Sequence, residues 1–125
     1  ENANVHGNLY GTSFAAVEKV SEQGKICLLD IDIQGVQSVK KSSMECKYLF
    51  ISPPSFKQLE SRLRGRATES EEAIQVRLKN AKSELHFGEA EGNFDAIVVN
   101  EKLDNAQADI VKNLNSWFPS MGMSV

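Results

Sequence analysis

Short, nearly continuous apolar runs alternate along this chain with segments whose apolar residues recur at helical spacing. The runs at residues 25–31, 47–52 and 95–100 are rich in β-branched residues and predict three strands buried on both faces. Strands that alternate with helices predict an α/β fold in which a mostly parallel sheet is flanked by helices. Three strands are few for a doubly wound sheet, so we expect a small variant or a partial fold.

Capping residues and apolar spacing predict five helices. Ser55 and Gln58 form an S-x-x-Q capping box at the start of the third helix, and acidic residues surround the start of the fourth, near Thr68 or Ser70. The helices are expected at residues 13–24, with Thr12 or Ser13 as the N-cap, and at 35–41, 55–65, 70–88 and 103–118. The first eleven residues are polar and contain glycine, so they predict a loop with at most one edge strand.

The composition is that of one globular domain. The 125 residues include 14 Lys and Arg, 17 Asp and Glu and 41% apolar side chains, with a net charge of −3. No apolar run approaches the roughly 20 residues that span a bilayer, and the mild negative charge argues against membrane or nucleic-acid partners. Cys27 and Cys46 are too far apart for a metal motif and are typical of reduced thiols, so we expect a cytoplasmic protein.

The arginines are confined to one part of the chain. All four lie within residues 62–77, at Arg62, Arg64, Arg66 and Arg77. Arg62 and Arg66 are four residues apart and share a helix face, where they repel each other unless an anion joins them. Beside Gly65 they could close over a polyphosphate whose oxygens gain charge during transfer. A solvated basic face neutralised by nearby glutamates is the alternative, and spacing alone leaves both open.

Two carboxylates stand where an apolar run turns into a helix. Asp30 and Asp32 end the first predicted strand, directly before Gly35, and ligands of open α/β sheets bind outside the carboxyl ends of strands. Asp32 could accept hydrogen bonds from a ligand amine, and Asp30 could hold a hydrated Mg²⁺. The alternative is that one aspartate only caps the helix. A weaker signal is the run GNLYGT at residues 7–12, whose hydroxyls suit an anion but are also common in turns.

Five collinear runs together resemble the guanylate kinase family. They are GNLYGTS at 7–13, LLDIDIQGV at 28–36, ISPPS at 51–55, RLRGRATESEEAIQVRL at 62–78 and IVVN at 97–100. The resemblance implies a P-loop nucleoside monophosphate kinase fold with a helical lid. It assigns residues 1–13 to the end of a GMP-binding lobe, residues 62–78 to the lid, and residues 14–61 and 79–125 to the core of the kinase domain.

The activity that the resemblance implies is transfer of the γ-phosphoryl group of Mg²⁺-bound ATP to GMP, giving ADP and GDP. GMP-binding roles are implied for Glu1, Tyr10, Thr12 and Asp32. Catalytic roles around the phosphates are implied for Asp30, Arg62, Arg66 and Arg77. ATP binding is implied for Arg62, Arg66 and Asn100, the last of these near the adenine. Arg64 matches no catalytic position of the family.

One departure from the family pattern is large, because no G-x-x-x-x-G-K-[ST] run occurs in these residues. In the family that phosphate-binding loop precedes the region that aligns with Glu1, so the chain resembles the C-terminal two-thirds of a guanylate kinase. We expect it to be inactive by itself, and exposed sheet edges could make it oligomerise. The alternative function is a catalytically dead guanylate-kinase-like scaffold domain that binds phosphorylated peptides.

Overall fold

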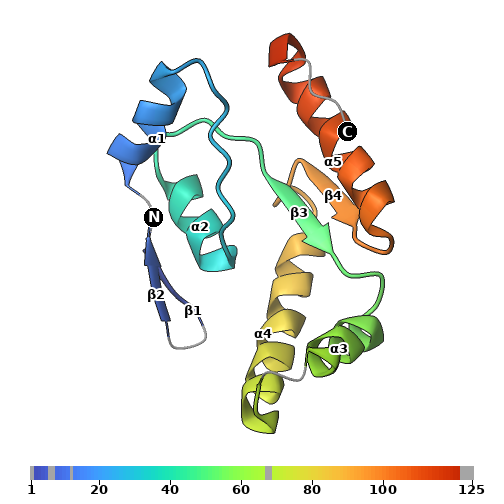
Figure 1. Ribbon diagram of the computed structural model, residues 1–125. Coiled ribbons are helices and arrows are strands. Elements are labelled where there is room, and N and C mark those ends of the chain that lie inside the picture. The colour runs from blue at the N-terminus through green and yellow to red at the C-terminus, as the bar shows by residue number, and fades with distance from the viewer. Residues whose placement is uncertain (1, 6–7, 12, 67–68, 122–125) are drawn as a thin grey trace. The chain divides into compact units, whose positions relative to one another are not determined.

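The computed structural model describes the backbone of residues 2–5, 8–11, 13–66 and 69–121. The chain divides into two compact units, Glu1–Cys46 and Lys47–Val125. The helices and strands are coloured along the chain in Figure 1. Among the described residues, no helix combines the length and the apolar character that crossing a bilayer requires.

The first unit contains an antiparallel hairpin and two helices. Strands β1 (Asn2–Val5) and β2 (Asn8–Gly11) pair from Asn2 with Gly11 to Val5 with Asn8, so this polar segment forms two strands rather than the predicted loop. Helix α1 (Phe14–Glu22) follows Ser13, whose side chain accepts a hydrogen bond from the backbone N–H of Ala16, which confirms the predicted N-cap. Helix α2 (Ile33–Lys41) contacts β1.

The prediction of a strand at residues 25–31 is wrong, because the segment has no regular secondary structure. A strand exists only where a neighbour accepts and donates its backbone hydrogen bonds, and no described strand pairs with these residues. Leu28 in this segment is 73% exposed, although its apolar surroundings predicted a buried position. Contrary to the sequence prediction, Asp30 and Asp32 therefore do not stand at the end of a strand.

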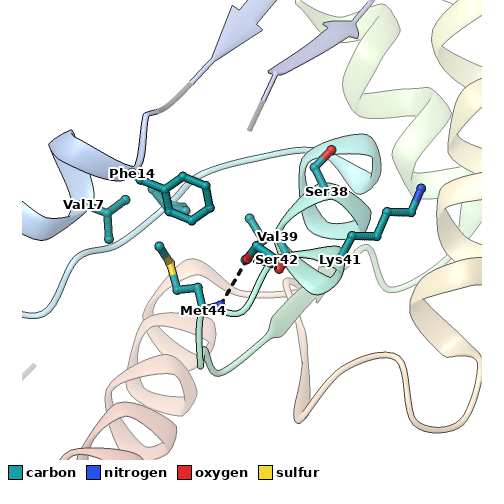
Figure 2. A pocket seen from close by; sticks show the side chains of 8 residues that line it. Phe14, Val17, Ser38, Val39, Lys41, Ser42 and Met44 are labelled. Atoms are coloured by element: carbon teal, nitrogen blue, oxygen red, sulfur yellow. Dashed lines mark hydrogen bonds between the residues drawn. The ribbon is translucent and has the colours of Figure 1, made fainter.

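An apolar cavity of about 350 Å³ lies within this unit. Figure 2 shows Phe14 and Val17 of α1 facing Val39 of α2, with Met44 closing one side. The hydroxyl of Ser42 accepts a hydrogen bond of 3.2 Å from the backbone N–H of Met44 and holds the end of α2 in place. The cavity is lined by Phe14, Val17, Leu29, Ser38, Val39, Lys41, Ser42 and Met44. No residue of α1 is buried, so the cavity between the two helices is open to solvent.

The second unit is built on a parallel strand pair. Strands β3 (Leu49–Ser52) and β4 (Ala96–Val99) pair in register from Leu49 with Ala96 to Ser52 with Val99, and both confirm predicted strands. Helices α3 (Phe56–Gly65) and α4 (Glu71–Glu89) make the connection between them. Helix α5 (Leu103–Trp117) and the short 3₁₀ helix Pro119–Met121 follow β4. The mixed α/β class with a parallel sheet is confirmed.

The core of this unit lies where α4 and α5 cover the two strands. Figure 1 shows α5 beside β4, and α4 contacts β3. Val98 at the centre of β4 is only 2% exposed. The other buried apolar side chains of the unit are Ile74, Leu78, Ala81 and Ala106. Ile51, Ile97 and Val99 remain about half exposed on the strands, so the prediction that these strands are buried on both faces is wrong. Association of copies through exposed sheet edges stays a prediction.

Glycine at position 88 allows α4 to approach the sheet closely. A Cβ atom on Gly88 would overlap Cε1, Cζ and Cδ1 of the Phe50 ring on β3. The same ring lies 5.2 Å from that of Phe94, and Phe94 lies 5.8 Å from Phe87 in an edge-to-face arrangement. The helix and strand therefore meet through an aromatic cluster that has no room for a side chain at residue 88.

An ion pair spans the joint between α3 and α4. Nη1 and Nη2 of Arg64 donate to the two carboxylate oxygens of Glu71 at 2.6 and 3.1 Å. Gln75 donates to the same carboxylate at 3.0 Å. These donors, the Arg64 guanidinium first, lower the pKa of Glu71 to about 2. The pair ties the last turn of one helix to the first turn of the next.

We expect Gly88→Ala to lower the free energy of unfolding by about 1 to 3 kcal/mol, because the new methyl group must displace the Phe50 ring. Gly65→Ala is the matched control, since a Cβ atom there meets nothing within 4 Å and helix propensity gains up to about 1 kcal/mol. Urea denaturation of both variants measures the difference. Equal stability of the two variants would contradict the packing described for residue 88.

The lowered pKa of Glu71 predicts a pH dependence of stability. A carboxyl group whose folded pKa lies below its usual 4.5 adds stability that is complete above that value and is lost as the pH falls towards 2. Arg64→Met should return the pKa of Glu71 towards its usual range and remove this part of the acid dependence. Carboxyl ¹³C NMR titration measures the shift, and Lys79→Met, a charge removal elsewhere on α4, should leave it in place.

Candidate active site

Asp32 is the N-cap of α2. Its Oδ1 accepts a hydrogen bond of 3.0 Å from the backbone N–H of Gly35, and its carbonyl oxygen accepts from Val36 at 3.0 Å. The cap that the sequence allowed for one aspartate is therefore formed by Asp32, and whether capping is its only role stays open. Oδ2 bonds to no other described group, so the cap leaves one carboxylate oxygen for a ligand. The predicted role in reading guanine is compatible with this geometry and stays a prediction.

Asp30 stands two residues earlier, in the segment without regular secondary structure, and its side chain is exposed. Within the described residues, no cluster of three His, Cys, Asp or Glu side chains could hold a metal ion by itself. Mg²⁺ in kinases takes one or two carboxylates and completes its shell with water and substrate phosphates. A single exposed carboxylate at residue 30 therefore fits a metal that arrives with a nucleotide.

Of the other three residues predicted to bind GMP, the structure describes only the backbone of Tyr10. Tyr10 lies in β2, where its backbone pairs with Ala3. Glu1 and Thr12 lie outside the described residues. The structure therefore gives the backbone position of Tyr10 in the hairpin. The roles of Glu1, Tyr10 and Thr12 stay predictions.

Arg62 lies at the carboxyl ends of the two parallel strands. It is on the last turn of α3, and its Nη1 donates to the carbonyl oxygen of Asn100 at 2.8 Å while Nη2 donates to that of Glu101 at 3.3 Å. Asn100 is held there because its backbone N–H donates to the carbonyl oxygen of Ser52 at 2.7 Å. Two residues predicted to bind ATP, 38 positions apart in the sequence, are thus brought together.

Arg66 follows directly as the C-cap of α3. Its backbone keeps helical dihedral angles, with φ −70° and ψ −25°, and its N–H donates to the carbonyl oxygen of Arg64. The side chain is exposed, and no bond to another described residue is formed by its guanidinium. The helix therefore continues far enough to carry Arg66 one turn beyond Arg62, as the four-residue spacing predicted.

Arg77 lies two turns into α4, between buried Ile74 and Leu78. Its Nε donates to Oε2 of Glu69 at 2.6 Å, and the Arg77 and Glu69 side chains are 35% and 27% exposed. Sequence reasoning treated Glu69 only as one of several neutralising charges. It missed the specific pair because the two residues are eight positions apart across a helix start, where helical spacing rules do not apply.

Arg64 does not join the other arginines. Both of its terminal nitrogens bond to Glu71, and its Nε lies 3.9 Å from Glu60. This agrees with the sequence analysis, which gave Arg64 no catalytic position. The pair holds two helices together rather than presenting charge to a ligand.

A model of the family described as guanylate kinase matches residues 1–117 of the chain. Guanylate kinase 1 of Oryza sativa subsp. japonica is 51% identical over 115 residues, which are 92% of this chain and 30% of the rice protein. Guanylate kinase of Schizosaccharomyces pombe (strain 972 / ATCC 24843) is 49% identical over 100 residues, 80% of this chain and 50% of the yeast protein.

Guanylate kinase of Homo sapiens is 41% identical over 115 residues, 92% of this chain and 58% of the human protein. The chain thus spans between 30 and 58% of the length of these three curated relatives. Because the family model matches nearly all of it, the chain belongs to the guanylate kinase family.

Proposed function

We propose that the protein containing this chain transfers the γ-phosphoryl group of ATP to GMP, giving ADP and GDP. The observation that carries the proposal is the contact of Arg62 with Asn100 at the carboxyl ends of β3 and β4. Ligands of open α/β folds bind at this edge of the sheet. The relatives are named guanylate kinases, and the proposal gives their named activity to this protein.

The ATP phosphates and the transferred phosphoryl group are assigned to the arginines of the second unit. Charge spreads over the oxygens of the transferred group in a loose transition state, and fixed guanidinium groups stabilise that charge. Arg77 is half-buried and anchored, so it is our choice for the transferred group. Arg62 and Arg66 bind the ATP phosphates from the lid, residues 62–78, and Asn100 lies near the adenine.

Recognition of GMP is assigned to the first unit. Guanine presents N1–H and an exocyclic amine as neighbouring donors, which carboxylates accept, whereas adenine lacks this pair. Glu1 and Asp32 are the proposed carboxylates, with Thr12 at the base and Tyr10 at the GMP phosphate. Residues 1–13 then form the end of the GMP-binding lobe, and residues 14–61 and 79–125 belong to the kinase core.

Mg²⁺ is expected to enter with ATP. Asp30 is the described carboxylate proposed to bind it through the ion's water shell. When bound, the ion supplies neutralising charge between the phosphate oxygens. The proposed location is the cytoplasm, because Cys27 and Cys46 are not joined in a disulfide, and the proposed partners are ATP and GMP.

Asp32→Asn separates base recognition from helix capping. Asparagine caps helices as well as aspartate does, so the melting temperature of the full-length protein should change little. The amide cannot accept both guanine donors, so kcat/KM for GMP should fall on the order of 100-fold. A coupled ADP-release assay measures the rate. Ordinary turnover of GMP by this variant would contradict the role given to Asp32.

Arg77→Ala in the full-length protein should lower kcat by about 100-fold or more, because it removes a fixed charge from the transferred phosphoryl group. Arg64→Ala is the matched control, since its guanidinium is bound to Glu71, and its kcat should stay within about threefold of the wild type. A full-length protein that binds phosphopeptides but releases no ADP with GMP would instead support the scaffold function.

A further inference from the structure

The ion pair of Arg77 with Glu69 differs in geometry from the other arginine contacts of the second unit. Arg77 uses Nε, the nitrogen nearest its backbone, for the 2.6 Å bond to Glu69. Arg64 instead gives both terminal nitrogens to Glu71, and Arg62 gives both to backbone carbonyl groups. Within the described part of the chain, Arg77 is anchored while its Nη atoms bond to no other residue.

This difference decides what each guanidinium can still bind. A guanidinium carries five N–H donors, one on Nε and four on the terminal nitrogens. Bidentate recognition of a phosphate needs two donors side by side. An arginine held only through Nε keeps all four donors of Nη1 and Nη2 for such a ligand, whereas Arg62 and Arg64 already use one donor on each terminal nitrogen.

The positions of both partners are set by the start of α4. Glu69 directly precedes Ser70, whose hydroxyl oxygen accepts a hydrogen bond of 3.2 Å from the backbone N–H of Ala73. Arg77 is fixed on the other side by its buried neighbour Leu78, which is 6% exposed. The Arg77 and Glu69 side chains are also less exposed, at 35% and 27%, than those of Arg64 and Glu71, at 41% and 61%. The bond therefore joins two groups whose backbones are already positioned.

We infer that Glu69 is a positioning residue that holds the Arg77 guanidinium through Nε, so that its terminal nitrogens face a phosphoryl group without further ordering. The inference rests on the proposed function. An unrestrained arginine loses side-chain entropy when a ligand fixes it. Glu69 fixes the Arg77 side chain before the substrate arrives. The expected effect is therefore on kcat, through transfer of the phosphoryl group, and not on the binding of either nucleotide.

Steady-state kinetics of the full-length protein test the inference. Glu69→Ala should lower kcat about tenfold and leave KM for ATP and for GMP within about twofold. Glu69→Gln keeps an acceptor for Nε and should retain more of kcat than Glu69→Ala. Glu72→Ala is the matched control, because Glu72 lies three residues after Glu69 in the first turn of α4 and is exposed, and its kcat should match that of the wild type.

A double-mutant cycle separates positioning from a general effect on folding. Once Arg77 is alanine, Glu69→Ala should change kcat by less than about twofold, because the group that it positions is gone. An equal loss in both backgrounds would overturn the inference and make Glu69 a structural residue. An unchanged kcat in Glu69→Ala would overturn the inference as well. A raised kcat would also overturn it, because the bond to Glu69 would then hold Arg77 away from the phosphoryl group.

A measurement without substrate keeps the inference apart from the proposed function. In the ligand-free protein, hydrogen exchange of the Arg77 Nε–H should become more than about tenfold faster in Glu69→Ala and not in Glu72→Ala. Equal exchange in wild type and Glu69→Ala would overturn the positioning role. Failure of the wild type to phosphorylate GMP would overturn the proposed function and the phosphoryl ligand assigned to Arg77. The exchange measurement would still decide whether Glu69 holds the Arg77 side chain.

Discussion

The parallel pairing of β3 with β4 is the constraint on which the second unit depends. Parallel strands cannot be joined by a tight turn, so the chain must leave β3 and return to the same end of the sheet before β4 begins. Helices α3 and α4 are that connection. Since both strands then end at one edge, the chain that follows β4 reaches the last turn of α3, and Arg62 can donate to Asn100.

Close packing of α4 on the sheet makes this connection rigid. Gly88 brings the C-terminal end of the helix against the Phe50 ring, Leu78 and Ile74 are buried nearer its start, and α4 also contacts α3. Arg77 lies on the same helix, so the packing of α4 also fixes the position of the Arg77 backbone. The charged groups at the joint of α3 and α4 therefore belong to helices that apolar packing holds in position. Their ion pairs orient side chains more than they stabilise the fold.

Residues of the first unit combine structural and proposed functional roles. Asp32 caps α2 with one oxygen and keeps the other, so a helix start and a ligand contact can use one side chain. The cavity between α1 and α2 shows that this unit leaves apolar surface unfilled by its own side chains. Residues 25–31 likewise keep the apolar character of a strand without a strand's hydrogen bonds.

The sequence by itself determined the elements whose causes are local. Ser13, Ser55 and Ser70 cap helices as predicted, and the apolar runs near residues 50 and 97 form strands, since capping and side-chain periodicity act over a few residues. Only the tertiary structure decided that residues 25–31 form no strand, that Arg62 reaches Asn100 and that Glu69 holds Arg77. Each of these depends on which backbone lies beside which, and hydrophobic spacing carries no information about a neighbour that is distant in the sequence.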